Sequence, residues 1–526
     1  MIRAFDSTGN EIGRNQTVIW CETGTSTQVT GTLVQDTIWS PTNGPFIVVG
    51  SITIPSRVTL VLQPGTTVCF DSAAELVVAD GGRLVADGTE TEPISFVSKP
   101  NAASRWKGIT VRGSIGSPES RLSNVYLQGN DSTAIHSVGG SVFLDRVRFG
   151  TADRQYLSLD DSSFVVQDCL FPTGIGEFEL VHGTGGIKPG GRGLFLRNFF
   201  GATSGYSDVI DFTGGNRGEG QIVEFIENVF AGTSDDHIDL DGTDAWVEGN
   251  IFLHAHKNGS PDTASGVSGG NSGTRTSEIT IIRNIFFDCD HAAMAKQGNF
   301  YVLLNNTIVH QSHIGGLDND GAVICLADEG TTEGAGMYLE GNIVFDIEKL
   351  TRNHRTATVT FNRNLLPLEW TGPGTGNLVS DPMFVHVPDV SETNFKNWTE
   401  AQVMWKWLSL RPMSPAKWAL DGSTDFGAVV FPGVYLVGEP EPVTTNTTIA
   451  IQVRPRIADF GVPGSGWPLG AGYTHYKWQL DNGTWSELIP LPTPITFVGL
   501  EPGRHTVRVI GIRDSGYAQS CLLYTS

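Results

Sequence analysis

Short runs of β-branched and aromatic residues, each closed by a turn rich in Gly, Pro or Asn, recur along much of the chain. Residues 58–62, 67–70 and 94–96 are examples of such runs. Strong turn signals, among them Pro64-Gly65 and Gly81-Gly82, separate them. Because the runs are short and good helix formers are scarce, the pattern predicts an all-β protein.

An asparagine followed by large apolar residues repeats through the middle of the chain. The repeated positions are Asn198, Asn228, Asn250, Asn284, Asn306, Asn342 and Asn364. Subtracting each number from the next gives spacings of 30, 22, 34, 22, 36 and 22 residues, as if loops were inserted into a shorter unit. A repeat of this size is typical of a solenoid. In a right-handed parallel β-helix each Asn would lie above the last and bond to it and to the neighbouring backbone.

These patterns divide the chain into domains. We expect a lead-in over residues 1–30 and a right-handed parallel β-helix over residues 31–369. Residues 370–437 are rich in Trp and Pro and contain a helical stretch at 400–410, so we expect them to cap the open strands of the last coil. Alternation with period two over residues 443–517 predicts a small β-sandwich of immunoglobulin or fibronectin type.

The ends of the chain suggest a larger context. Residues 2–9 are similar to residues 507–516, which have the pattern of a last strand and closing turn. We therefore expect the chain to begin inside an upstream immunoglobulin-like domain, with its natural start and signal peptide missing. The tail 521–526 is out of character with the rest and is expected to be non-native.

Charge and composition narrow the classes of function. The formal net charge is −22, which excludes a nucleic-acid groove, because such a groove needs a basic surface. The charge suits a secreted or cell-surface protein that binds cations, although acidic surfaces are equally common without that role. The six cysteines form no CxxC pair, so neither a zinc nor a redox site is indicated. No apolar stretch is long enough to span a membrane.

Acidic clusters fall on neighbouring coils. Aligning the pentapeptides DVIDF and DHIDL places Asp208 beside Asp236 and Asp211 beside Asp239, with Asp235 adjacent. Coils lie about 4.8 Å apart, so these carboxylates repel unless a cation lies among them. Ca²⁺, which takes six to eight oxygen ligands, fits such a set. The alternative is an exposed acidic ridge of turn-forming Asp. The interleaved Ile, Phe and Leu favour an ordered strand and hence the metal site.

The motifs S-D-V-I-D and D-D-H-I-D, 28 residues apart, resemble the calcium site of the family-nine pectate lyases. The resemblance covers about residues 190–310 and implies a β-helix with an asparagine ladder. It implies Asp211, Asp235, Asp236 and Asp239 as Ca²⁺ ligands, with Asp208 as a weaker candidate. It also implies β-elimination, in which Ca²⁺ acts as a Lewis acid and a lysine or arginine removes a proton.

The chain departs from the family pattern at the catalytic base. The family has a lysine on the coil after the second Asp motif, but the matching residues 265–270 contain none. The catalytic candidates are Lys257 and Lys296, of which Lys296 is preferred because we expect it on a strand, stacked under Asp241. A structural salt bridge from Lys296 to Asp241 or Asp290 is the alternative. Side chains expected to line the same groove and bind substrate are His254, His256, His291 and Trp246, with Tyr206 and Tyr301 as further aromatic candidates. Polar or core packing is the alternative for each.

Three functions remain open. The first is a secreted, monomeric, Ca²⁺-dependent polysaccharide lyase acting on an acidic, uronate-containing glycan. The second is a non-catalytic adhesin-type module with a structural Ca²⁺, which the missing lysine favours. The third is an inverting glycoside hydrolase, which would use carboxylates around a water and no metal.

Overall fold

A computed structural model of the protein describes most of the chain. The described residues are 2–5, 11–15, 26–216, 220–257, 264–310, 321–328, 330–420, 422, 424–429, 433–438, 440, 444–445, 447–455, 473–491, 493–513, 515–519 and 523–525. The chain divides into two compact units. Unit 1 comprises residues 1–158 and 169–171, and unit 2 comprises residues 159–168 and 172–526.

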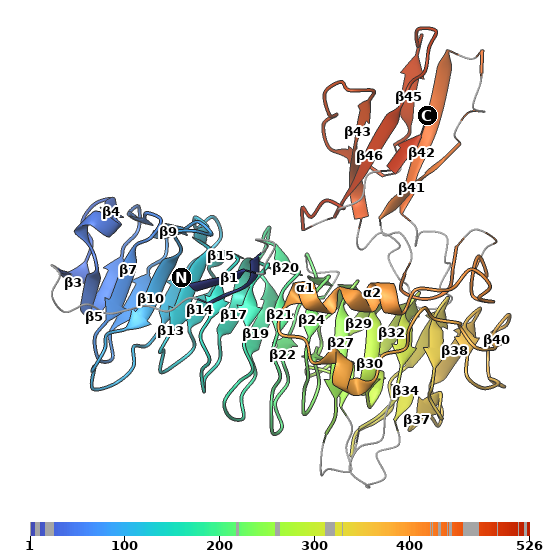
Figure 1. Ribbon diagram of the computed structural model, residues 1–526, viewed down its shortest axis with the longest axis horizontal. Coiled ribbons are helices and arrows are strands. Elements are labelled where there is room, and N and C mark those ends of the chain that lie inside the picture. Colours follow the sequence, from blue (N-terminus) through green and yellow to red (C-terminus); the bar gives the residue numbers. More distant parts are fainter. Residues whose placement is uncertain are drawn as a thin grey trace. The chain divides into compact units, whose positions relative to one another are not determined.

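Unit 1 contains the first coils of a parallel β-helix (Figure 1). Its strands form three columns of parallel pairs, β6-β9-β12-β15, β7-β10-β13-β16-β18 and β8-β11-β14. An antiparallel pair, β1 with β2, precedes them. The elements are β1 (Ile2–Phe5), β2 (Glu11–Asn15), β3 (Thr27–Thr32), β4 (Thr37–Trp39), the 3₁₀ helix η1 (Pro41–Asn43), β5 (Phe46–Ile54), β6 (Thr59–Leu62), β7 (Thr67–Phe70), β8 (Glu75–Val78), β9 (Arg83–Asp87), β10 (Ile94–Ser98), β11 (Ile109–Arg112), β12 (Ser120–Ser123), β13 (Val125–Gln128), β14 (Ile135–Val138), β15 (Ser141–Asp145), β16 (Arg148–Phe149) and β18 (Leu170–Phe171).

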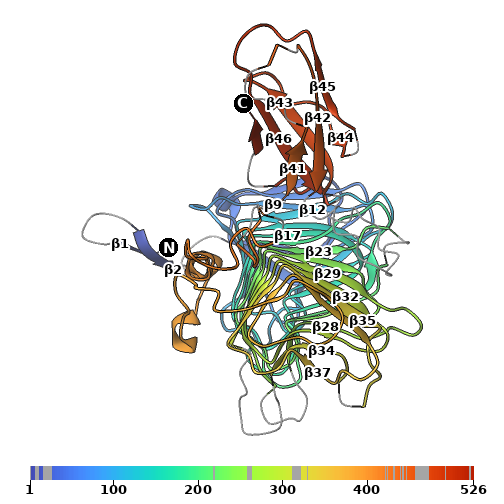
Figure 2. The ribbon, with the colours of Figure 1, turned by 90° about the vertical axis from the view of Figure 1, so that its right-hand side faces the viewer.

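Unit 2 also contains a parallel β-helix, whose strands form three columns. These are β19-β22-β25-β28-β31-β34-β37, β20-β23-β26-β29-β32-β35-β38 and β21-β24-β27-β30-β33-β36-β39-β40, all parallel. In Figure 2 the strands β23, β29, β32 and β35 follow one face, and β28, β34 and β37 follow another. The predicted parallel β-helix is therefore confirmed.

The strands of the unit 2 helix are short, as the sequence pattern predicts. They are β17 (Leu157–Gln167), β19 (Val181–Ile187), β20 (Gly193–Leu196), β21 (Phe199–Phe200), β22 (Ile210–Thr213), β23 (Val223–Ile226), β24 (Val229–Phe230), β25 (Ile238–Asp239), β26 (Ala245–Glu248), β27 (Ile251–Ala255), β28 (Ser265–Gly269), β29 (Glu278–Ile282), β30 (Ile285–Cys289), β31 (His291–Ala295), β32 (Phe300–Leu304), β33 (Thr307–Val309), β34 (Ala322–Cys325), β35 (Gly336–Glu340), β36 (Ile343–Phe345), β37 (Thr351–Arg352), β38 (Thr358–Asn362), β39 (Leu365–Leu366) and β40 (Leu378–Val379).

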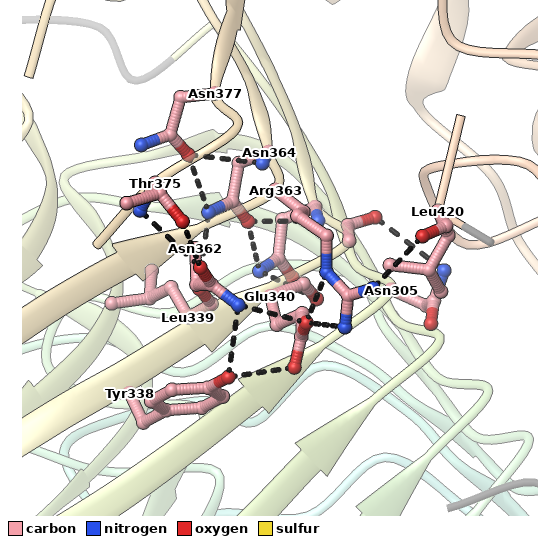
Figure 3. A network of polar contacts seen from close by, with 12 residues as sticks. Asn305, Tyr338, Leu339, Glu340, Asn362, Arg363, Asn364, Thr375, Asn377 and Leu420 are labelled. Carbon is pink, nitrogen blue, oxygen red and sulfur yellow. Dashed lines mark hydrogen bonds and ion pairs between the residues drawn. The ribbon is translucent and has the colours of Figure 1, made fainter. Parts of the chain in front are cut away.

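The asparagine ladder is present as predicted. Each buried Asn donates its side-chain N–H to the side-chain oxygen of the next, at 2.9–3.0 Å from Asn198 to Asn364. The same oxygen also accepts the backbone N–H of the preceding Asn. Asn377, which the repeat did not reveal, ends the column by accepting from Asn364 at 3.1 Å (Figure 3). The ladder satisfies the buried turn amides of every coil in unit 2 from Asn198 onward.

Aromatic rings stack inside the coils in step with the ladder. Phe200, Phe230, Phe252 and Phe286 lie in successive coils, with ring centroids 5.0, 4.8 and 4.7 Å apart. All four are buried. The ladder and this stack fix the register between coils, because a shift of one residue would expose both.

The segment after the last coil packs against the side of the β-helix in unit 2. The helices α1 (Trp398–Ala401) and α2 (Val403–Trp407) and the 3₁₀ helix η2 (Val390–Thr393) follow β40. Ala401, Met404 and Leu408 share one apolar core with residues of β21, β24, β27 and β30, over which Figure 1 shows both helices. At the end of the column, the guanidinium of Arg363 is held by Glu340 and donates to the carbonyl of Leu420 at 3.0 Å (Figure 3).

The C-terminal segment forms two antiparallel sheets around one apolar core. One sheet has the order β41-β42-β45 and the other β44-β43-β46-β47. The strands are β41 (Val434–Val437), β42 (Thr448–Pro455), β43 (Tyr473–Leu480), β44 (Ile489–Pro490), β45 (Ile495–Val498), β46 (Val507–Arg513) and β47 (Leu523–Thr525). The predicted small sandwich is thus present. It includes β41, which lies in the segment that we assigned to the cap.

Cys69, Cys169, Cys289 and Cys325 are buried free thiols, and Cys21 and Cys521 lie outside the described residues. Among the described residues, no helix is long and apolar enough to cross a membrane.

Candidate metal centre

The predicted alignment of the two acidic motifs is confirmed by the strand register. In the column β22-β25-β28, Asp211 is paired with Asp239, and Asp239 is paired with Ser268. The flanking Ile238 and Leu240 are buried in the coil interior. Since side chains alternate along a strand, the aspartates project from the outer face of the helix.

A group of three carboxylates lies where the chain enters β22 and β25. Carboxylate oxygens of Asp208, Asp235 and Asp236 all lie within 4.8 Å of one another. Backbone bonds hold two of them, because Asp236 N–H donates to Asp208 Oδ1 at 2.9 Å and Ser265 N–H donates to Asp236 Oδ1 at 2.7 Å. Asp208, the weaker candidate from the resemblance, belongs to this cluster, whereas Asp211 and Asp239 lie further along the strands. We call these three residues the acidic cluster.

The acidic cluster is electrostatically unfavourable on its own. Burial, together with the neighbouring carboxylates, raises the pKa of Asp208 and of Asp236 well above the ordinary range. Burial raises the pKa of Asp239 to about 7, although Lys296 opposes the rise. Asp239 Oδ1 is itself buried and has no hydrogen-bond partner among the described residues. Carboxylates in this state are stabilised by a nearby cation.

Two lysines approach these carboxylates in different ways. Lys257 Nζ lies 2.8 Å from Asp235 Oδ1 and 4.7 Å from the ring centroid of Tyr206, an exposed side chain. Lys296 is stacked two coils from Asp241, as predicted, with Gly270 between them. Burial lowers the pKa of Lys296, but Asp239 and other carboxylates outweigh burial and raise it.

The predicted salt bridge of Lys296 to Asp241 or Asp290 is not among the ion pairs of the described residues. Lys296 therefore faces the carboxylates as a partly buried charge without a direct ion-pair partner in the described part of the chain. Lys257, by contrast, is directly paired.

The four side chains predicted to bind substrate lie in different surroundings, and their binding role stays a prediction. Trp246 is 2% exposed and donates its indole N–H to Glu248 at 2.8 Å, on the column of β26 and so away from the aspartates. His291 is fully buried, and burial lowers its pKa to about 4. His254, which is partly exposed, and His256, which is buried, are each paired with carboxylates. Tyr301 is fully buried. Sequence spacing did not reveal the burial of Trp246, His256, His291 and Tyr301.

A second polar group was missed by the sequence reasoning. His182 Nδ1 lies 2.8 Å from Glu179 Oε2 and 3.5 Å from Asp211 Oδ2. The carboxylates of Asp211 and Glu179 raise the pKa of His182 to about 10. Because His182 is paired with Asp211 in the β19-β22 register, aligning one more coil would have found it. His182 and Glu179 thus contact Asp211, which does not belong to the acidic cluster.

Comparison with known proteins gives little further information. No protein-family model and no curated protein matches the chain. A solved structure named "Rhamnogalacturonan lyase" is similar, with a TM-score of 0.32 and 14% identity, covering 59% of this chain and 80% of that one. The fold assignment rests on the strand pairing described above, and the function must be argued from the site.

Proposed function

We propose that this protein is a secreted, Ca²⁺-dependent polysaccharide lyase that cleaves an acidic, uronate-containing glycan by β-elimination. The observation that carries the proposal is the convergence of three carboxylates, of which Asp236 is buried and the other two are partly buried, with Lys257 paired to one of them and Lys296 within their electrostatic reach. Oxygen-only donors in this number suit Ca²⁺. The orphaned Oδ1 of Asp239 is a further oxygen donor on the same face.

The residues of the chain have distinct roles in this proposal. Asp208, Asp235 and Asp236 hold the ion, and Asp239 completes its surroundings. The chemistry that a bound Ca²⁺ supplies is neutralisation of a uronate carboxylate, which makes the neighbouring C–H more acidic. Tyr206 offers an exposed ring on which a sugar can stack.

Lys296 is the preferred base. Its raised pKa depends on the charges of Asp239 and Asp236, so neutralising those carboxylates lowers the pKa and frees the amine to accept a proton. The proton at C5 moves to the lysine, the C5–H electron pair forms the C4=C5 double bond, and the C4–O bond breaks. The oxygen released from C4 takes up a proton from solvent and becomes a hydroxyl, and the lysine returns to solvent the proton that it removed, so no water is consumed.

The proposal is tested by following the ultraviolet absorbance of the unsaturated uronate product. Pectate, alginate and glycosaminoglycans are incubated with the protein in Ca²⁺ and in EDTA. We expect product from one of these glycan classes when Ca²⁺ is present and none in EDTA. The rate of product formation should fall at least about 100-fold for Lys296→Met. Glu487→Gln, an exposed change in the C-terminal sandwich, is the matched control and should keep full activity. Absence of product from every glycan contradicts the proposal.

One observation favours a second candidate, a non-catalytic Ca²⁺-binding module. The coil that follows the second acidic motif contains β28, and neither this strand nor Gly270 after it carries a lysine. Ca²⁺ binding without product formation, together with glycan retention on an affinity gel, would support this candidate. The inverting hydrolase is disfavoured, because its two carboxyl groups must be about 6.5–9.5 Å apart around a water. The acidic cluster is tighter, with oxygens within 4.8 Å.

A further inference from the structure

Lys257 forms the closest ion pair to the acidic cluster. Its Nζ lies 2.8 Å from Asp235 Oδ1, and only 9% and 18% of the two side chains are exposed. Water therefore screens this pair weakly. Although burial lowers the pKa of Lys257, Asp235 raises it, so the ammonium form is the one that faces the cluster.

Asp290 holds the backbone that positions Lys257. Its Oδ2 accepts the backbone N–H of Lys257 at 3.3 Å and that of Ala264 at 3.1 Å. Its Oδ1 lies 3.0 Å from His256 Nδ1. One buried carboxylate thus contacts the residue before Lys257, Lys257 itself, and the residue that leads into β28.

The contacts continue from His256 to the cap. His256 Nε2 lies 3.1 Å from Asp288 Oδ2, which lies 2.8 Å from His254 Nδ1. His254 Nε2 lies 3.0 Å from Thr393 Oγ1 of η2. These groups come from β27, the end of β30 and the cap, so Asp290 is anchored to rigid elements. We call Asp290, His256, Asp288, His254 and Thr393 the anchoring chain.

We propose that Lys257, positioned by Asp290, is a built-in counter-ion of Asp235 that a divalent cation must displace to enter the acidic cluster. The inference rests on the proposed function only in taking the acidic cluster as the cation site. An ion bound to Asp235 would lie within a few ångströms of the ammonium, and two positive charges at that separation repel strongly when poorly screened. Because Lys257 Nζ lies 4.7 Å from the ring centroid of Tyr206, we expect the displaced ammonium to remain near this ring. There it can pair with an anionic ligand, so the cation binds before the anion.

The test is calorimetric titration of CaCl₂ at fixed ionic strength into the wild-type protein, Lys257→Met and Lys296→Met. Lys296→Met is the matched control, since it removes an equal charge that faces the same carboxylates without a direct ion pair. We expect Lys257→Met to bind Ca²⁺ at least about tenfold more tightly than wild type, and Lys296→Met to change the affinity less. Equal or weaker binding by Lys257→Met overturns the inference, as does an equal gain in both variants.

The positioning role of Asp290 is tested in the same titration. Asp290→Asn should bind Ca²⁺ more tightly than wild type, because it loosens the hold on Lys257. The double variant Lys257→Met/Asp290→Asn should bind no more tightly than Lys257→Met alone. A merely structural loss at Asp290 would weaken binding in both backgrounds and overturn the positioning role. Thermal melts in EDTA confirm that each variant is folded. If neither the wild type nor any variant binds Ca²⁺, the metal site itself is overturned. If all of them bind Ca²⁺ with equal affinity, the site stands and only the role of Lys257 is overturned.

Discussion

Asp236 is the most deeply buried member of the acidic cluster. Its carboxylate is fully enclosed and close to Asp208 and Asp235, and its Oδ1 accepts a backbone N–H from Ser265. An asparagine oxygen can accept the same bond without carrying charge. Asp236→Asn therefore removes the destabilising effect of the buried charge while keeping the acceptor for the Ser265 hydrogen bond.

We expect Asp236→Asn to change stability and binding in opposite directions. In EDTA the variant should melt about 2 °C or more above wild type, because one buried like charge is gone. Its affinity for Ca²⁺ should fall at least about tenfold, because one ligand charge is lost. Differential scanning calorimetry and titration calorimetry measure the two effects. A variant that is less stable in EDTA would contradict the electrostatic account of the cluster.

His256 gives the protein a predictable response to pH. Burial lowers its pKa, but Asp288 and Asp290 outweigh burial and raise it to about 9. A His pKa above its unfolded value of about 6.5 contributes stability that is complete below that pH and is lost as the pH rises through about 9. The free energy of unfolding of wild type relative to His256→Gln should fall by roughly 3 kcal/mol between pH 6 and pH 10. Urea unfolding at both pH values measures it, and a constant difference would refute it.

For individual residues, the sequence predicted which aspartates lie on neighbouring coils, but not which of them cluster together. Asp211 and Asp239 were aligned correctly because strand pairing follows from the apolar pattern around them. Their separation from the acidic cluster depends on how the chain enters β22 and β25 and on His182, which spacing alone does not reveal. The surroundings of His254 were not predictable, because this residue, with φ of 57°, stands at an irregular point of β27, where simple alternation no longer distinguishes inward from outward side chains.

At the level of elements, the ladder is the feature most sensitive to a single change. Asn284 Oδ1 accepts the side-chain and backbone N–H groups of Asn250, both at 2.9 Å, and its own side chain donates to the carbonyl of Val247 at 3.0 Å. An alanine there leaves several buried polar groups without partners.

We expect Asn284→Ala to lower the free energy of unfolding by about 3 kcal/mol or more. Asn377→Ala is the control, because Asn377 ends the ladder and is partly exposed, so water can replace its bonds. Asn377→Ala should lower the free energy of unfolding by a clearly smaller amount than Asn284→Ala. Chemical denaturation of both variants provides the comparison, and equal losses would show that position in the column is irrelevant.

The ladder was predictable because the same chemistry is required once per coil. Asn377 was missed because the last interval is 13 residues, shorter than any spacing in the repeat. The cap helices were expected near residues 400–410 and occur at α1 and α2. The pairing of β41 with β42 was not expected, since nothing in the local sequence of a short strand states which sheet it joins.

For the whole molecule, the charge of −22 makes cations a general stabilising factor, and only a specific site distinguishes Ca²⁺ from salt. With free Ca²⁺ at about 100 times the dissociation constant, the free energy of unfolding of wild type should rise by about 2.7 kcal/mol. NaCl of equal ionic strength is the control that should lack this gain. At the same Ca²⁺ concentration Asp236→Asn, with at least about tenfold weaker binding, should gain no more than about 1.4 kcal/mol. A rise of equal size in NaCl would mean that the effect is screening alone.

The ladder also sets what the protein tolerates along its length. The bonds between ladder asparagines join one coil to the next, and the intervals between these residues differ from 22 to 36 residues without breaking the column. Lys257 lies in one of the longer intervals, between Asn250 and Asn284. We therefore expect that the loops inserted between coils can be exchanged. A new binding specificity can be introduced by replacing one such loop while the asparagine ladder stays intact.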